Sequence, residues 1–225
     1  MTLLAEDLLL LLIDDASGAL LLDSTRLDRA LAGAVLLELA LAERVGPPPP
    51  GRRFGRDRIV LLDGRPTGDP LLDDALARLD SPRPPRAARA VEKLVKGTRQ
   101  ALLHRLVEAG HVREEHRTVL GVFRSSRWPA VRPEHEAAVR RDLHAALVEG
   151  APPDLRTAAL TSLLVAVDVV PKVVSAPDRR ALVRRAKAVA DGEWAGVAVR
   201  KAVEAVNAAL VASVVAVSVA TTVTS

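Results

Sequence analysis

The sequence predicts a mostly α-helical protein: a single compact helical domain with one protruding β-hairpin and a few short strands. Hydrophobic residues make up 49% of the 225 residues and gather in long leucine- and alanine-rich stretches. Clusters of proline and glycine separate these stretches at helix-like lengths. We find no internal repeat and no clean linker, so one domain is predicted over residues 1–225.

The first two helices are predicted to be buried. Residues 2–12 form a short apolar helix. The second helix begins after Asp23, a capping candidate, and ends before the four prolines at 47–50. Between residues 30 and 42 its only charge is Glu38, so we expect it to be covered on nearly all sides.

Turn chemistry defines the next helices. Asp69 as N-cap and Pro70 at the first position predict a helix start. A longer helical region ends at Gly110 and is expected to break near Gly97, with Thr98 as a possible cap of the second part.

Two short extended regions are predicted. Residues 59–62 are a strand candidate. The hairpin is assigned to arms 118–123 and 127–131 around a turn at 124–126, and Pro129 confines its second arm to an edge.

After Pro133 the pattern is helical to the end of the sequence. Breaks are predicted at 150–153, 171–177 and 191–192. Residues 205–225 carry no charge, and we expect a buried terminal helix rather than a membrane anchor, because polar residues dilute the stretch.

Composition limits the classes of function. The 32 basic residues against 28 acidic ones give a net charge of +4, and all but five of the basic residues are arginines. The planar guanidinium of arginine suits phosphate and carboxylate, so an acidic partner fits this composition. The absence of cysteine excludes disulfide scaffolds, thiolate zinc sites and cysteine nucleophiles. Four aromatic residues are too few for a protein that stacks the bases of single-stranded nucleic acid.

No motif indicates catalysis or a cofactor. There is no P-loop, G-x-S-x-G, G-x-G-x-x-G or helical histidine metal pair, so we predict no enzyme, cofactor or metal. The five histidines are expected at the surface. Glu38 and Asp168 are lone carboxylates in apolar helices, for which we expect paired or hydrogen-bonded structural roles. Asp73 and Asp74 offset a helix dipole in the first turn of their helix.

The location is expected to be cytoplasmic. The N-terminal apolar run is preceded by Glu6 and Asp7 and by no basic residue, unlike a signal peptide.

Four segments together resemble the Golgi phosphoprotein 3 family. They are LLAEDLLLLLIDDASG followed by GAVLLELALAERV, then PTGDPLLDDAL, then LLHRLVEAGHV running into TVLGVFRSSRWPAV, and finally LRTAALTSLLVAVDVV. They occur in the family's order, and PTGDPLLDDAL is the most specific. The resemblance implies a peripheral membrane protein with an all-α core and a protruding hydrophobic hairpin. The eukaryotic members bind phosphatidylinositol 4-phosphate and retain Golgi glycosyltransferases, whereas this composition resembles a bacterial branch.

The resemblance also implies a headgroup site. Counting back from the segment 106–110 places Lys96 and Arg99 on the family's basic pair. Gly97 and Thr98 would add the N–H groups of a helix start, which together with flanking cations favour an anion.

Half of the family's pocket is absent from this sequence. The family's tryptophan position falls at Asp23, and its first arginine position falls at Ala32. Arg29 lies about one helical turn from Ala32 and Arg26 about one turn further, and both are expected to supply positive charge instead.

The hairpin is the second expected contact. Phe123 and Trp128 lie beside Arg124 and Arg127. An aromatic ring suits the headgroup level of a bilayer, and each arginine gains about 1 kcal/mol from anionic lipid. The same residues suit a homo-oligomer interface.

The sequence therefore predicts a non-enzymatic peripheral membrane protein that binds anionic phospholipid headgroups similar to phosphatidylinositol 4-phosphate, with no nucleic-acid partner. Two alternatives remain. One is a soluble protein-interaction module that associates through the hairpin. The other is a winged-helix-type nucleic-acid regulator, in which the helix after Asp23, the basic loop 52–58 and the strand 59–62 imitate helix plus wing.

Overall fold

The computed structural model describes residues 2–14, 17–49, 55, 58–119, 123–191, 208 and 211, and for 117–119 and 123–125 it describes the backbone alone. The described elements are, in chain order, α1 (Leu4–Leu11), α2 (Ser24–Leu41), β1 (Val45–Gly46), β2 (Val60–Leu61), α3 (Pro70–Leu79), α4 (Ala87–Glu108), β3 (Glu115–Val119), β4 (Phe123–Arg127), α5 (Glu134–His144), the π-helical turn η1 (Ala145–Glu149), α6 (Leu155–Ala166), α7 (Val170–Val173) and α8 (Arg179–Ala190). These elements confirm the predicted mostly α fold with a hairpin and short strands.

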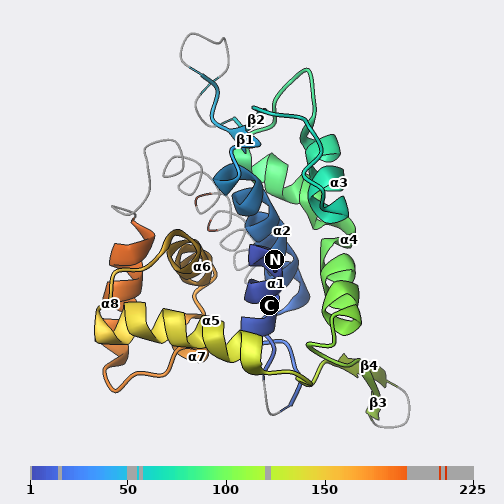
Figure 1. The fold of residues 1–225 in the computed structure, drawn as a ribbon. Helices are drawn as coiled ribbons and strands as arrows, with labels where there is room; N and C mark the ends of the chain where they lie inside the picture. The colour runs from blue at the N-terminus through green and yellow to red at the C-terminus, as the bar shows by residue number, and fades with distance from the viewer. Residues whose placement is uncertain are drawn as a thin grey trace, which may run out of the picture.

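Helix α1 lies in the middle of the molecule. Figure 1 shows α1 beside α2, with α3 and α4 on one side and α5 to α8 on the other. Helix α1 contacts α2, α4, α5 and α6, and all eight of its residues are buried. Each fully buried leucine contributes about 1.5–3 kcal/mol to folding, so this leucine-rich helix organises the core around itself.

Helix α2 confirms the predicted cap and burial. The Asp23 carboxylate accepts a hydrogen bond from the Arg26 N–H at 3.0 Å, and every residue from Ala30 to Leu37 is buried. The helix ends at Leu41. Strand β1 follows it and pairs antiparallel with β2, so the strand predicted at 59–62 is confirmed and its partner is Val45–Gly46.

Helices α3 and α4 begin and break where the sequence predicted. The Asp69 carboxylate accepts from the N–H groups of Leu71 and Leu72, and Pro70 occupies the first turn. Helix α4 leaves helical geometry at Lys96 and Gly97, where Gly97 has φ of +83°. The prediction that Thr98 caps the second part is wrong, because its buried hydroxyl donates to the Leu94 carbonyl across the break.

The hairpin turn lies earlier than predicted. Residues 124–126 belong to β4 and pair with 116–118 of β3, and Val119 pairs with Phe123. The strands therefore leave 120–122 between them, which lie outside the described residues. Their sequence, Leu-Gly-Val, is a three-residue connection with a glycine, a common hairpin length. The polar Arg-Ser-Ser segment predicted a turn, but its residues belong to strand β4.

The residues that follow β4, beginning with Trp128, lie against the loop after α1 (Figure 1). We call this part the root of the hairpin. The Trp128 N–H donates to the Gly18 carbonyl at 2.9 Å. Gly18 has φ of +63°, and a Cβ there would lie 2.9 Å from the Pro129 nitrogen. Only glycine combines this backbone conformation with so close an approach.

The second half differs from the prediction in two details, and a third prediction falls outside the described residues. Pro171 lies in the first turn of the four-residue helix α7, so the break predicted at 171–177 begins only after Val173. Asp168 is exposed with φ of +54° just after α6, so the expected position inside an apolar helix is wrong. Within 205–225 only Ala208 and Val211 are described, so the predicted terminal helix lies almost wholly outside the described residues. None of the described helices is both long and apolar enough to cross a membrane.

Candidate functional site

The four predicted headgroup-binding cations lie on two helices that pack against each other. Arg26 and Arg29 are in the first turns of α2, Lys96 is at the break in α4, and Arg99 follows the break. Arg29 Nε is 2.6 Å from a Glu92 oxygen, so this pair joins α2 to α4. We call these four residues the α2/α4 cluster.

A second pair, Arg99 to Asp28, makes the same connection. Arg99 Nε is 3.1 Å from an Asp28 oxygen. Partial burial raises the pKa of the Asp28 carboxyl, and the Arg99 charge opposes that rise. Two of the four predicted cations are therefore held by carboxylates that the sequence prediction did not consider.

The remaining donors of the cluster are incompletely used. Arg26 donates through Nη2 to the Val167 carbonyl at the end of α6. Its Nε, and Nη1 of Arg29, are buried without a hydrogen-bond partner in the described structure. Buried N–H donors normally have a partner, so these two donors remain available for an acceptor that the described residues do not supply.

Lys96 contributes a different kind of charge. Its side chain is exposed and forms no ion pair with a described residue, while its backbone carbonyl accepts from Arg78 at 2.6 Å. The ammonium therefore faces solvent beside the more buried arginines.

The two family positions that differ in this sequence add no basic group. Ala32 is fully buried. Asp23 is exposed, and its carboxylate caps α2. The cluster is therefore built from Arg26 and Arg29 on the α2 side.

Helix α4 connects the cluster to the hairpin. After the break it runs from Thr98 to Glu108, and the chain then turns at Gly110 toward β3; these eleven residues of helix span roughly 16 Å. Trp128 is half-buried and packs against the core, and Arg127 is half-buried. The side chains of Phe123 and Arg124 lie outside the described part.

The sequence prediction missed a buried ionic network around α1. The Glu6 carboxylate, 6% exposed, is 2.8 Å from Arg105 Nε. The Asp7 carboxylate, 1% exposed, is 2.7 Å from Arg156 Nη2 and 2.6 Å from His135 Nε2. Two adjacent acids in a leucine helix were the available signal, because a buried carboxylate requires a cationic or hydrogen-bonding partner.

Glu38 belongs to the same network, which confirms its predicted structural role. One of its oxygens accepts from the Leu4 N–H, and the other is 3.8 Å from Arg156 Nη1. Burial raises the pKa of the Glu38 carboxyl, against the opposing effects of the Leu4 N–H and Arg156.

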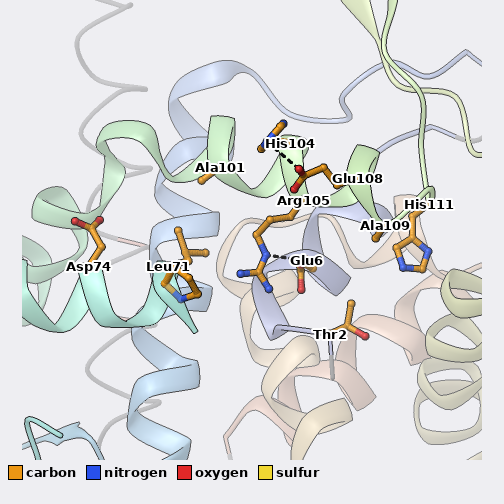
Figure 2. Close-up of a pocket in the computed structure, with 11 residues that line it drawn as sticks. Thr2, Glu6, Leu71, Asp74, Ala101, His104, Arg105, Glu108, Ala109 and His111 are labelled. Atoms are coloured by element: carbon orange, nitrogen blue, oxygen red, sulfur yellow. Dashed lines mark hydrogen bonds and ion pairs between the residues drawn. The ribbon is translucent and has the colours of Figure 1, made fainter. Parts of the chain in front are cut away.

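A cavity of about 960 Å³ opens between α1, α3 and α4. Figure 2 shows Arg105 in it, with its guanidinium toward Glu6, and His104 beside Glu108. Both oxygens of Glu6 are engaged, by Arg105 and by the Leu3 N–H, so this carboxylate is no free base. The described lining includes none of the α2/α4 cluster.

Two of the five histidines, His111 and His135, are partly buried, so the prediction that all lie at the surface is wrong for them. The rings of His111 and His135 are 5.5 Å apart at the root of the hairpin, and Nδ1 of His111 is buried. His104, His116 and His144 are exposed as predicted. No three His, Asp or Glu side chains within the described ranges are placed to hold a metal ion.

These features define a class of helical protein in which a charged central helix is fully buried and one long helix links a basic cluster to a projecting hairpin. A family model described as Golgi phosphoprotein 3 (GPP34) matches residues 4–206. The chain belongs to this family, which confirms the resemblance read from the four sequence segments.

Proposed function

We propose that this protein is a cytoplasmic, non-enzymatic peripheral membrane protein that binds anionic phospholipid headgroups at the α2/α4 cluster. The observation that carries the proposal is the gathering of four cations on two packed helices, where Arg26 and Arg29 also keep N–H groups without a partner among the described residues. Phosphate oxygens are strong acceptors, and their hydrogen bonds to arginine are short and charge-assisted.

The surrounding groups support an anion rather than a neutral ligand. Glu92 and Asp28 fix Arg29 and Arg99 but leave each guanidinium with further N–H groups. The exposed Lys96 ammonium adds a charge that no described carboxylate neutralises. A phosphatidylinositol 4-phosphate-like headgroup, with several anionic oxygens, suits this set.

The hairpin supplies the second signal that stable membrane association requires. Its connecting residues 120–122 are apolar in sequence, and Arg127 follows them in β4. Weak attraction at the hairpin and at the α2/α4 cluster adds up, because both belong to one body joined by α4.

Vesicle flotation tests the proposal. Neutral vesicles, phosphatidylglycerol vesicles and phosphatidylinositol 4-phosphate vesicles of matched charge are compared at low and high salt. Preference for the phosphoinositide supports a shaped headgroup site, and equal salt-sensitive binding to both anionic membranes supports recognition by charge. Failure to bind any of them would overturn the proposal.

A pair of variants tests the assignment to the cluster. Lys96→Gln/Arg99→Gln should weaken flotation with anionic vesicles, whereas Arg65→Gln/Arg83→Gln removes the same charge from exposed loops on either side of α3. Thermal unfolding checks that both variants fold. Equal binding by the two variants would place the headgroup site elsewhere.

The hairpin also favours a second candidate, a protein-interaction module. The β3–β4 sheet has two strands, so its outer edges have no strand partner among the described residues. Light scattering over a wide concentration range tests it, and a constant monomeric mass would count against a homo-oligomer. The winged-helix alternative requires an exposed recognition helix that contacts base edges. Helix α2 does not meet this requirement, because it is buried from Ala30 to Leu37.

A further inference from the structure

Helix α8 carries a second basic surface, separate from the α2/α4 cluster. One side of the helix, with Leu182, Ala186 and Val189, is buried, and α8 contacts α6, α7 and η1. The other side exposes four cations, none in an ion pair with a described residue. These residues, the α8 cationic face, are Arg179, Arg180, Arg184 and Lys187.

The spacing of these residues makes the face continuous. Arg180, Arg184 and Lys187 follow one another at four and three residues, which places them on one side of a helix over about 10 Å. Figure 1 shows α8 across the α1–α2 pair from α4, the helix that contains Lys96.

Two nearby groups hold α8 in place, and one of them, Asp178, also interacts electrostatically with Arg184 of this face. Arg185 turns inward and donates to the carbonyls of Ala146 and Gly150, both at 3.2 Å. The Asp178 carboxylate caps the helix through the N–H groups of Arg180 and Ala181. Residues 178–191 contain five cations and two carboxylates, a net charge of +3.

The position of the first two arginines is unfavourable for the helix. Arg179 and Arg180 occupy the first turn of α8, which contains no acidic residue. The helix dipole disfavours positive charge at that end. The Asp178 carboxylate at the N-cap offsets part of this cost, but the two arginines beside it keep the start of the helix positive overall.

We propose that the α8 cationic face is a second binding surface for an anionic lipid bilayer, one that acts by charge and does not distinguish headgroups. This inference rests on the proposed membrane function and extends it to a site that the family resemblance did not suggest. The face is a row of exposed cations along one helix, and each such cation gains free energy near an anionic membrane surface. Residues 178–191 contain no aromatic ring for stacking nucleic-acid bases.

Partition onto phosphatidylglycerol vesicles at low salt tests the inference with Arg180→Gln/Arg184→Gln. Each cation near an anionic surface contributes about fivefold to the partition coefficient, so the variant should bind roughly 25-fold more weakly. The control Arg65→Gln/Arg83→Gln lowers the net charge equally and should change binding by less than about threefold if contact is local. Circular dichroism confirms that α8 is retained.

The outcomes separate this inference from the proposed function. If the parent protein binds no anionic vesicle, the proposed function fails and this inference fails with it. If the parent binds and Arg180→Gln/Arg184→Gln binds equally well, or no worse than the control, only the α8 assignment is overturned. A variant that keeps vesicle binding but loses binding to double-stranded DNA would identify nucleic acid as the occupant and overturn it too.

Discussion

Arginine has opposite roles around α1 and on α8. Arg105 and Arg156 contact the buried carboxylates of Glu6 and Asp7 and join α1 to α4 and α6. Arg180 and Arg184 are exposed and form no ion pair with a described residue. The α2/α4 cluster is intermediate, with two ion pairs and two unused buried donors. The environment, not the number of arginines, therefore determines which positive charge is available to a partner.

The largest expected effect on stability is in the buried ionic network around α1. Asp7→Ala leaves His135 without its carboxylate and Arg156 with the more distant Glu38 alone, and we expect a loss of about 3 kcal/mol in the free energy of unfolding. Urea unfolding measures it. Asp74→Ala is the control, because it breaks an exposed pair with Arg78 and should cost less than about 0.5 kcal/mol. Equal losses would mean that burial does not distinguish the two networks.

An intermediate effect is expected for the ion pairs of the α2/α4 cluster. Arg29→Gln/Arg99→Gln removes two partly exposed bridges between α2 and α4, and the expected loss is about 1 kcal/mol. Thermal unfolding at low and high salt measures this loss, which should shrink as salt screens the pairs in the parent. A loss as large as that of Asp7→Ala would place the cluster with the structural network.

On α8 we expect a substitution of arginine to stabilise the protein rather than destabilise it. Arg179→Glu places a carboxylate in the first turn of the helix and should raise the free energy of unfolding by about 0.3–1 kcal/mol. The same change should weaken binding to anionic vesicles. Unfolding and flotation measured on one preparation test both directions. A variant that is less stable than the parent would show that Arg179 has a structural partner.

The smallest effect concerns the titration of Glu38. Burial raises its folded pKa above the ordinary value of 4.5, so its stabilising contribution is complete below that pH. The contribution is lost as pH rises through the folded pKa. Glu38→Gln should therefore be more favourable, relative to the parent, at pH 7 than at pH 4. Thermal unfolding at the two pH values measures the difference. An unchanged difference would show that Glu38 does not titrate between them.

Local chemistry allowed much of the fold to be predicted from the sequence. Asp23, Asp69 and Pro70 begin helices, and Gly97 interrupts one, because capping and backbone conformation depend on a few neighbouring residues. The turn of the hairpin was misplaced because the polarity of Arg-Ser-Ser suggested a turn there. Those three residues instead pair with β3 as part of strand β4.

The candidate site was less predictable because its state depends on distant partners. The resemblance identified Lys96 and Arg99, but the neutralising contacts of Asp28 and Glu92 require α2 to pack on α4. Likewise, the partners of Asp7 are 128 and 149 residues further along the chain. No periodicity or capping rule specifies such pairs.

The same separation has a consequence for synthesis on the ribosome. Helix α1 is made first, yet the Asp7 carboxylate meets His135 and Arg156 only after the chain has grown through α5 and into α6. Until then the leucines of α1 lack most of the residues they pack against. If α1 paired early with α2 alone, the Asp7 carboxylate would be buried without its cationic partners. The network around α1 therefore cannot close until α6 has emerged, and we expect the nascent N-terminus to stay incompletely folded until then.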